Sequence, residues 1–187
     1  MRFLTRTLAA LVVLLPLAAS AQTYTGTTFR WAGGPITTFA TGPTDWVVLT
    51  GSATKTVTVS HIAVCGTATV AATIDVTIIK RSTTNTGGTS SAGTAVNLSD
   101  SNVAATATMS VYTANPTIGT AVGNADVKKL NLGPPGSAGC VLLDYGTRDG
   151  SGPITLLTTG HLIAINLLGQ TVPAGLSLDY MIETNER

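Results

Sequence analysis

Two histidines, His61 and His161, are the side chains best suited to metal binding or acid–base catalysis in this sequence of 187 residues. A zinc site needs further ligands close by and outer groups that orient them, yet the aspartates stand singly and no HxxxH, HxD or DxDxD spacing occurs. Asp144 and Asp149 flank a turn, but two carboxylates do not supply the six to eight oxygens that calcium takes. We therefore expect a structural turn there, strand histidines beside a polar neighbour or solvent, and neither metal nor cofactor.

The sequence also contains no recognisable motif for nucleophilic catalysis or for glycoside hydrolysis. No G-x-S-x-G motif is present, and no Gly-rich loop precedes a helical pattern. Glu183 and Glu186 lie at the C-terminal end, where we expect solvated carboxylates and not a glycosidase pair. A Ser-His-Asp arrangement can form from residues far apart in sequence, which keeps a secreted hydrolase as the least favoured alternative. The expectation is a protein that is not an enzyme.

Trp31 is the best candidate for a ligand or interface contact. It follows Phe29 and Arg30 in a segment rich in Thr and Gly, whereas Trp46 precedes an apolar run and is expected to begin a core strand. Exposed aromatic rings stack on sugars, and Trp and Arg are common anchors of subunit interfaces. We expect Trp31 at the surface, against either a glycan or a neighbouring subunit.

The two cysteines, Cys65 and Cys140, stand 75 residues apart and have no metal-motif spacing. In an exported protein they could form one disulfide, which the chain-entropy model values at roughly 4.5 kcal/mol for a loop of this length. Two buried thiols that behave as small apolar side chains are the alternative. The pairing depends on the compartment of the protein.

Residues 1–21 resemble a secretory signal peptide. Arg2 and Arg6 precede an apolar run over residues 8–19, and Ala19-Ser20-Ala21 is a small-x-small cleavage site, so the mature chain is expected to begin at Gln22. The run is shorter than the ~20 residues of a membrane span. Cleavage of this signal would make the protein secreted or periplasmic, with no membrane segment in the mature form.

Charged side chains are scarce, with 10 Lys and Arg against 9 Asp and Glu. Without Arg2 and Arg6 the balance is 8 minus 9, or −1. Nucleic acids and anionic lipids require a concentrated positive patch, so we expect no nucleic-acid partner. Thr, at 34 residues, combines with Val and Ile to favour strands.

Alternation with a period of two recurs after the signal segment, and no helical period is sustained. In residues 73–80 the apolar side chains alternate with polar ones, residues 103–111 repeat the pattern, and residues 176–182 do so most clearly. A change of phase near Ser60-His61 indicates a bulge. Gly- and Pro-rich turns separate these segments. The sequence predicts an all-β, jelly-roll-like antiparallel β-sandwich of about eight strands over residues 44–187, preceded by an extended arm over residues 22–43.

Residues 80–187 carry a resemblance to a known group of proteins. The stretches that carry it are Lys80-Arg81-Ser82-Thr83-Thr84-Asn85-Thr86-Gly87-Gly88-Thr89, Val111-Tyr112-Thr113-Ala114-Asn115-Pro116-Thr117-Ile118-Gly119-Thr120, and Val172-Pro173-Ala174-Gly175-Leu176-Ser177-Leu178-Asp179. They resemble small β-rich proteins encoded among the virion genes of tailed phages. The resemblance implies a structural virion component, a head-decoration or tail-associated subunit, and brings no catalytic residues.

Two functions therefore compete. The first is a non-enzymatic structural subunit of a phage virion that contacts other virion proteins and its own copies, as a homo-oligomer. The alternative is an exported bacterial adhesin or carbohydrate-binding β-sandwich module. The signal segment and Trp31 support this alternative. The location that the resemblance implies is the virion, and a secreted or periplasmic location is its alternative.

Overall fold

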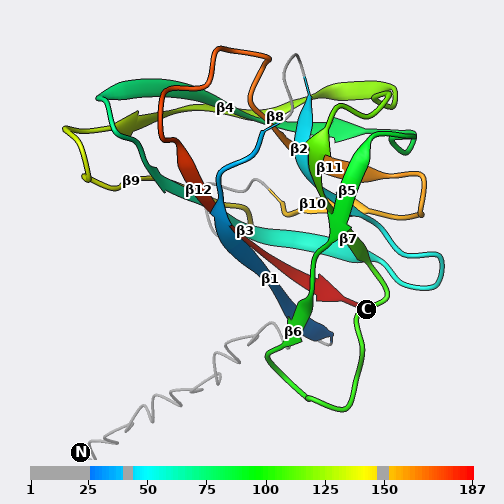
Figure 1. Cartoon of the computed structure of the whole chain (residues 1–187). Coiled ribbons are helices and arrows are strands. Elements are labelled where there is room, and N and C mark those ends of the chain that lie inside the picture. The colour runs from blue at the N-terminus through cyan, green and yellow to red at the C-terminus, as the bar shows by residue number, and fades with distance from the viewer. Residues whose placement is uncertain (1–25, 40–43, 147–151) are drawn as a thin grey trace, which may run out of the picture.

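The computed structural model describes residues 26–39, 44–146 and 152–187. These residues form an all-β protein of two antiparallel sheets that share one core (Figure 1). The expected signal peptide, residues 1–21, lies outside the described residues. No helix in the described part of the chain has the length and hydropathy needed to cross a membrane.

Sheet A has the order β10-β3-β12-β1-β6, and β9 pairs with β3 on the same edge as β10. Its strands are β1 (Thr27–Ile36), β3 (Val57–Thr67), β6 (Ala95–Asn97), β9 (Gly139–Asp144), β10 (Ile154–Leu156) and β12 (Ser177–Glu186).

Sheet B has the order β5-β7-β2-β11-β4-β8. Its strands are β2 (Asp45–Thr50), β4 (Ala72–Arg81), β5 (Thr89–Ala92), β7 (Thr108–Ala114), β8 (Ala121–Leu132) and β11 (Leu162–Asn166). The described residues thus hold twelve strands where the sequence predicted about eight. Strand β1 lies in the segment expected to be an arm, and the short strands β5 and β6 carry no alternation that would predict them.

The core lies between the sheets and is filled by one face of each strand, as period-two side chains require. The inward phases predicted for residues 73–80 and 176–182 are confirmed, because Ile74, Val76 and Ile78 of β4 and Leu178, Tyr180 and Ile182 of β12 are all buried. Trp46 begins β2 inside the core, as expected, and meets Tyr180 edge-on at 6.0 Å between ring centroids.

The predicted bulge near Ser60-His61 is confirmed. Strand β12 pairs with β3 in continuous register up to His61, opposite Glu183, and then Thr184 lies opposite Val59, which leaves Ser60 as the extra residue. Before the bulge Val57 and Val59 of β3 face the core, and after it Ile62 and Val64 do.

The arm expected over residues 22–43 is instead a sheet strand where it is described. β1 pairs with β12 on one side and with β6 on the other. Its Phe29 and Trp31 turn to the interior, while Arg30 and Ala32 turn outward. The sequence could not show this, because the pairing partner of β1 lies at the opposite end of the chain.

The outer faces of the two sheets differ. On sheet B a second apolar cluster, Val48, Tyr112, Leu162 and Ala164, lies on the face opposite the main core and is buried. The loops 82–88 and 115–120 meet beside this face through the Thr86–Thr117 bridge and the Asn85–Gly119 hydrogen bond. On sheet A the outward side chains include Leu142, which is 61% exposed.

Candidate functional site

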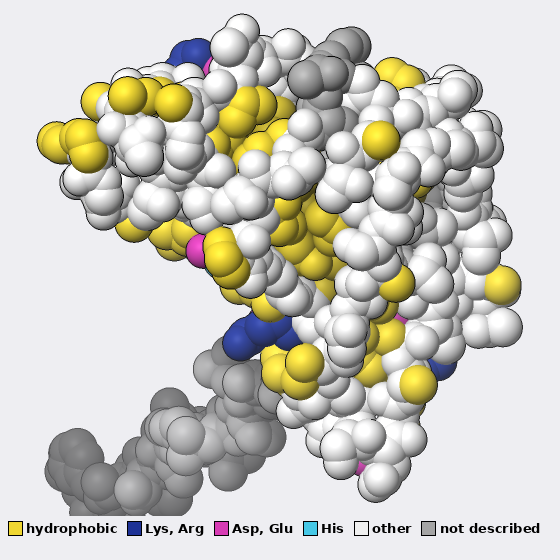
Figure 2. Space-filling model, in the orientation of Figure 1, with side chains coloured by type: hydrophobic (Ala, Val, Ile, Leu, Met, Phe, Trp, Pro, Cys, Tyr) yellow, Lys and Arg dark blue, Asp and Glu magenta, His cyan; other side chains and the backbone are white. Residues whose placement is uncertain are grey.

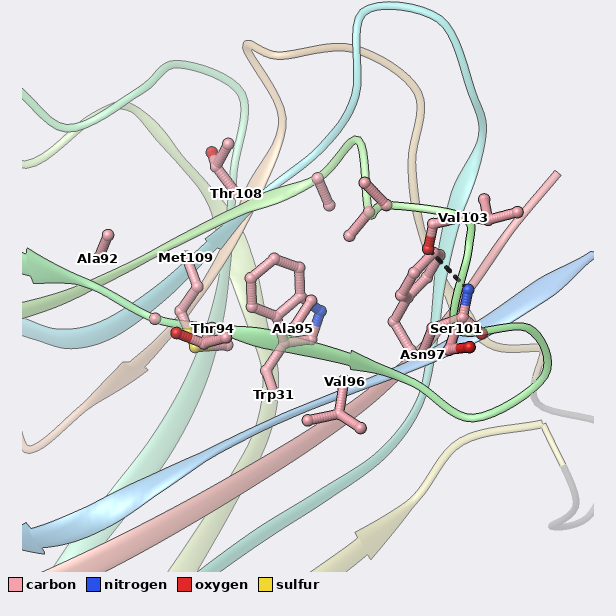
Figure 3. Close-up of a pocket in the computed structure, with 15 residues that line it drawn as sticks. Trp31, Ala92, Thr94, Ala95, Val96, Asn97, Ser101, Val103, Thr108 and Met109 are labelled. Carbon is pink, nitrogen blue, oxygen red and sulfur yellow. Dashed lines mark hydrogen bonds between the residues drawn. The ribbon is translucent and has the colours of Figure 1, made fainter.

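A pocket of about 600 Å³ opens where the chain passes from β5 in sheet B to β6 in sheet A. In Figure 3 the ring of Trp31 lies between β6, which carries Ala95 and Val96, and the segment that runs from Val103 to Thr108. The pocket therefore lies at one end of the core, between an edge strand of sheet A and the segment that leads into β7.

Small side chains make the space. Phe29 and Trp31 of β1 line the pocket, and its other lining residues are mainly Ala, Gly and Thr. The wall is held in place by Asn97, whose Nδ2 donates to the Val103 carbonyl at 2.8 Å (Figure 3) and whose Oδ1 accepts from the backbone N–H of Ser99 and Asp100. The pocket is thus a preformed, largely apolar hollow with a polar rim, suited to an apolar group.

The expectation of a surface position for Trp31 is wrong. The side chain is only 3% exposed, and its Nε1 is buried without a hydrogen-bond partner among the described residues. The cause is the alternation of β1, which turns Trp31 inward together with Phe29. The ring is part of the core and of a pocket wall, so it offers no open face on which a sugar could stack.

Cys65 and Cys140 form a disulfide between β3 and β9. The two residues are opposite each other in the antiparallel register, so the sheet itself brings them together. Their neighbours Val64 and Val141 point to the core, which places the disulfide on the outer face of sheet A.

The two histidines lie apart. His61 of β3 hydrogen-bonds through Nδ1 with Asp144, its cross-strand neighbour on β9, so it has the polar neighbour that the sequence predicted. His161 lies in the turn before β11 and not in a strand, and its Nδ1 accepts the backbone N–H of Leu157 at 3.3 Å. Among the described residues no group of three His, Cys, Asp or Glu side chains could hold a metal ion. Asp149 lies outside the described residues.

Asp45 is the centre of a buried polar cluster that sequence reasoning missed. Its carboxylate accepts Nε and Nη2 of Arg81 at 2.6 and 2.7 Å, and Nδ2 of Asn85 and of Asn166 at 2.8 Å each. Arg81 also donates to the Gly119 carbonyl at 2.9 Å. The cluster ties three strand ends of sheet B to the adjoining loops, and with its hydrogen-bonding groups engaged it is structural.

The expectation that Glu186 is solvated is also wrong. Glu186 is 1% exposed and binds backbone groups of the segment before β7, whereas Glu183 is half-buried and pairs with Arg30 at 2.9 Å. The two carboxylates have separate partners, and neither lines the pocket.

Three tyrosines have a pKa above the ordinary value. Burial raises the pKa of Tyr180, burial and the Asp45 charge raise that of Tyr112, and burial and the Asp126 charge raise that of Tyr145 most. Each hydroxyl therefore stays neutral at physiological pH, and none acts as a proton acceptor there.

Comparison with protein-family models, with curated proteins and with solved structures finds no match for this chain.

Proposed function

We propose that the protein is a non-enzymatic structural subunit of a phage virion, a head-decoration or tail-associated component, whose body is a jelly-roll-like sandwich. The resemblance over residues 80–187 supports the virion role. The surface in view in Figure 2 has few charged side chains and several apolar ones, which suits a subunit that packs against neighbours.

Strand β8 carries the proposal. It is one of the two edge strands of sheet B and, with 12 residues, the longest strand described. Residues 121–125 are exposed and uncharged, and Val122 is 64% exposed. An unpaired edge of this kind is a template for adding a strand from another chain.

The second half of β8 differs. Asp126, Lys128 and Lys129 place charges on it, and charges on an edge oppose uncontrolled pairing. The uncharged part of this edge is therefore its first half, where bulges at Val122 and Ala125 interrupt the register with β4.

Mass spectrometry of purified virions tests the role directly. We expect the protein among the virion components, and its absence would reject the proposal. Val122→Lys places a charge on the edge and should lower incorporation of the protein into virions. Because the Val122 side chain is exposed, the substitution leaves the core intact. Val70→Lys, at a half-exposed valine in the β3–β4 turn, is the matched control and should be incorporated normally.

The disulfide favours a second candidate, an exported adhesin or carbohydrate-binding module, because such bonds persist in oxidising compartments. A mature protein that begins at Gln22 would support export, and one that begins at Met1 or Arg2 would reject it. The buried ring of Trp31 offers no face to a sugar, so a glycan would bind elsewhere on the surface, and binding of the purified protein on a glycan array would support this candidate. A blank array for the unmodified protein would exclude the carbohydrate-binding reading.

A further inference from the structure

A row of charged and basic side chains crosses the outer face of sheet A. Asp144 of β9 lies opposite His61 of β3, His61 opposite Glu183 of β12, and Glu183 opposite Arg30 of β1. All four alternate with core residues and therefore point outward. Across the four strands the signs read acidic, basic, acidic, basic.

The next outward row is apolar. Leu142 of β9 lies opposite Ala63 of β3, Ala63 opposite Met181 of β12, and Met181 opposite Ala32 of β1. Side-chain size alternates along this row (large, small, large, small), just as the sign of the charge alternates along the first row. Leu142 is 61% exposed and Ala63 only 8%, so the alanine lies in a dip between its larger neighbours.

Each row is complementary to a second copy of itself that runs in the opposite direction across the strands. A two-fold axis parallel to the strands, midway between β3 and β12, turns a second copy face to face with the first. Asp144 then meets Arg30 of the other copy and His61 meets Glu183. In the apolar row Leu142 meets Ala32 and Met181 meets Ala63, so each large side chain faces a small one.

We propose that the outer face of sheet A is the interface of a two-fold symmetric dimer of this chain. The inference rests on the proposed role as an assembling subunit and names a surface for it. An interface of this kind uses one patch on both copies, and its charges fix register and partner more than they add affinity.

The face is close to the size of a standard interface. Strands β9, β3, β12 and β1 hold 6, 11, 10 and 10 residues, and spacings of ~3.3 Å along a strand and ~4.8 Å between strands give them a projected area of roughly 600 Å². A standard interface buries about 800 Å² on each partner.

Leu142→Arg tests the apolar row. Sedimentation velocity of the purified protein should show a dimer, and this variant should show a monomer, because two arginines then face the small side chains of the other copy. Val127→Arg is the matched control, since Val127 is 52% exposed but belongs to β8 of sheet B. It should remain dimeric.

A charge exchange tests the two-fold arrangement itself. Arg30→Glu brings like charges together across the interface and should raise the dimer dissociation constant at least about tenfold. Adding Asp144→Lys should restore most of the affinity. Within one chain these positions are three strands, about 14 Å, apart, and the exchange does not rebuild the Arg30–Glu183 pair, so recovery reports the contact between copies.

Three results would overturn the interface: a monomer at every concentration, a dimer that Leu142→Arg leaves as stable as Val127→Arg does, or a double variant no tighter than Arg30→Glu. Virion composition is measured separately. If the protein is a dimer but is absent from virions, the virion role is rejected and the interface is retained. If it is present in virions but monomeric in solution, the interface is rejected and the virion role is retained.

Discussion

The carboxylate of Glu186, in the last strand, accepts the backbone N–H of Ala107 at 2.9 Å, across 79 residues of sequence. The same carboxylate accepts the backbone N–H and the hydroxyl of Thr106, the hydroxyl at 2.6 Å, while Lys55 approaches it at 4.0 Å. A charged acceptor with several donors is among the stronger buried interactions. It fixes the end of the segment that forms one side of the Trp31 pocket.

Glu186→Ala removes this acceptor and leaves two backbone N–H groups without their partner. We expect a loss of about 2–4 kcal/mol in the free energy of unfolding, measured by urea denaturation, and faster amide exchange in residues 98–107. Glu183→Ala is the control, because its ion pair with the half-exposed Arg30 is worth ~1 kcal/mol or less. Equal losses in the two variants would contradict the assigned role.

The buried Asp45–Arg81 pair gives a second prediction. Arg81→Met keeps the length of the side chain but leaves the carboxylate, which is 0% exposed, with only its two asparagine partners. We expect a loss of about 3–5 kcal/mol in the free energy of unfolding, because an unpaired buried charge is costly.

Replacing both partners separates the charge effect from packing. Arg81→Met with Asp45→Asn should lose less than Arg81→Met alone, since no buried charge remains. Lys129→Met, which breaks the exposed pair with Asp75 at 2.6 Å, should cost ~1 kcal/mol or less. A double variant less stable than the single one would show that the cluster holds sheet B together in some other way.

These two clusters mark the limit of what the sequence could predict. The strand over residues 176–182 was predictable because its alternation is local, and so was the bulge at Ser60. Glu186 and Asp45 were not predictable as buried acceptors, because their donors come from segments 36 to 121 residues away. A carboxylate near a chain end or a strand start is usually solvated, and only the tertiary pairing overrides that expectation.

The position of Trp31 was also not predictable from the sequence, for the same reason. Its neighbours Arg30 and Gly33 suggested a surface segment, yet β1 lies between β12 and β6 in sheet A. A strand of mixed composition reveals its buried face only when its partners are known. The pocket depends further on β5 and β6, whose sequences of four and three residues are too short to show an alternation.

The disulfide between Cys65 and Cys140 gives a third prediction. Cys65→Ser with Cys140→Ser opens a loop of 75 residues in the unfolded chain and should lower the free energy of unfolding by about 2–5 kcal/mol, a range that includes the chain-entropy value. Urea denaturation of the oxidised protein, with and without a reducing agent, measures the effect. The reduced wild type should match the double variant. A wild type insensitive to the reductant would show that the thiols are unpaired in the purified protein.

Tyr145 gives the last prediction, on alkaline stability. Burial and the Asp126 charge raise its pKa above the ordinary value of 10.0, so the folded protein keeps this proton when the unfolded chain has lost it. Its contribution to stability is complete below pH 10 and is lost as the pH rises from there towards the folded pKa. Tyr145→Phe cannot ionise, and the hydroxyl that it lacks has no hydrogen-bond partner among the described residues. The variant should therefore match the wild type at pH 8 and lose less stability between pH 10 and 12, as urea titrations at each pH would measure. Parallel losses in the two proteins would mean that Tyr112 and Tyr180, whose pKa values are also raised, account for the alkaline unfolding.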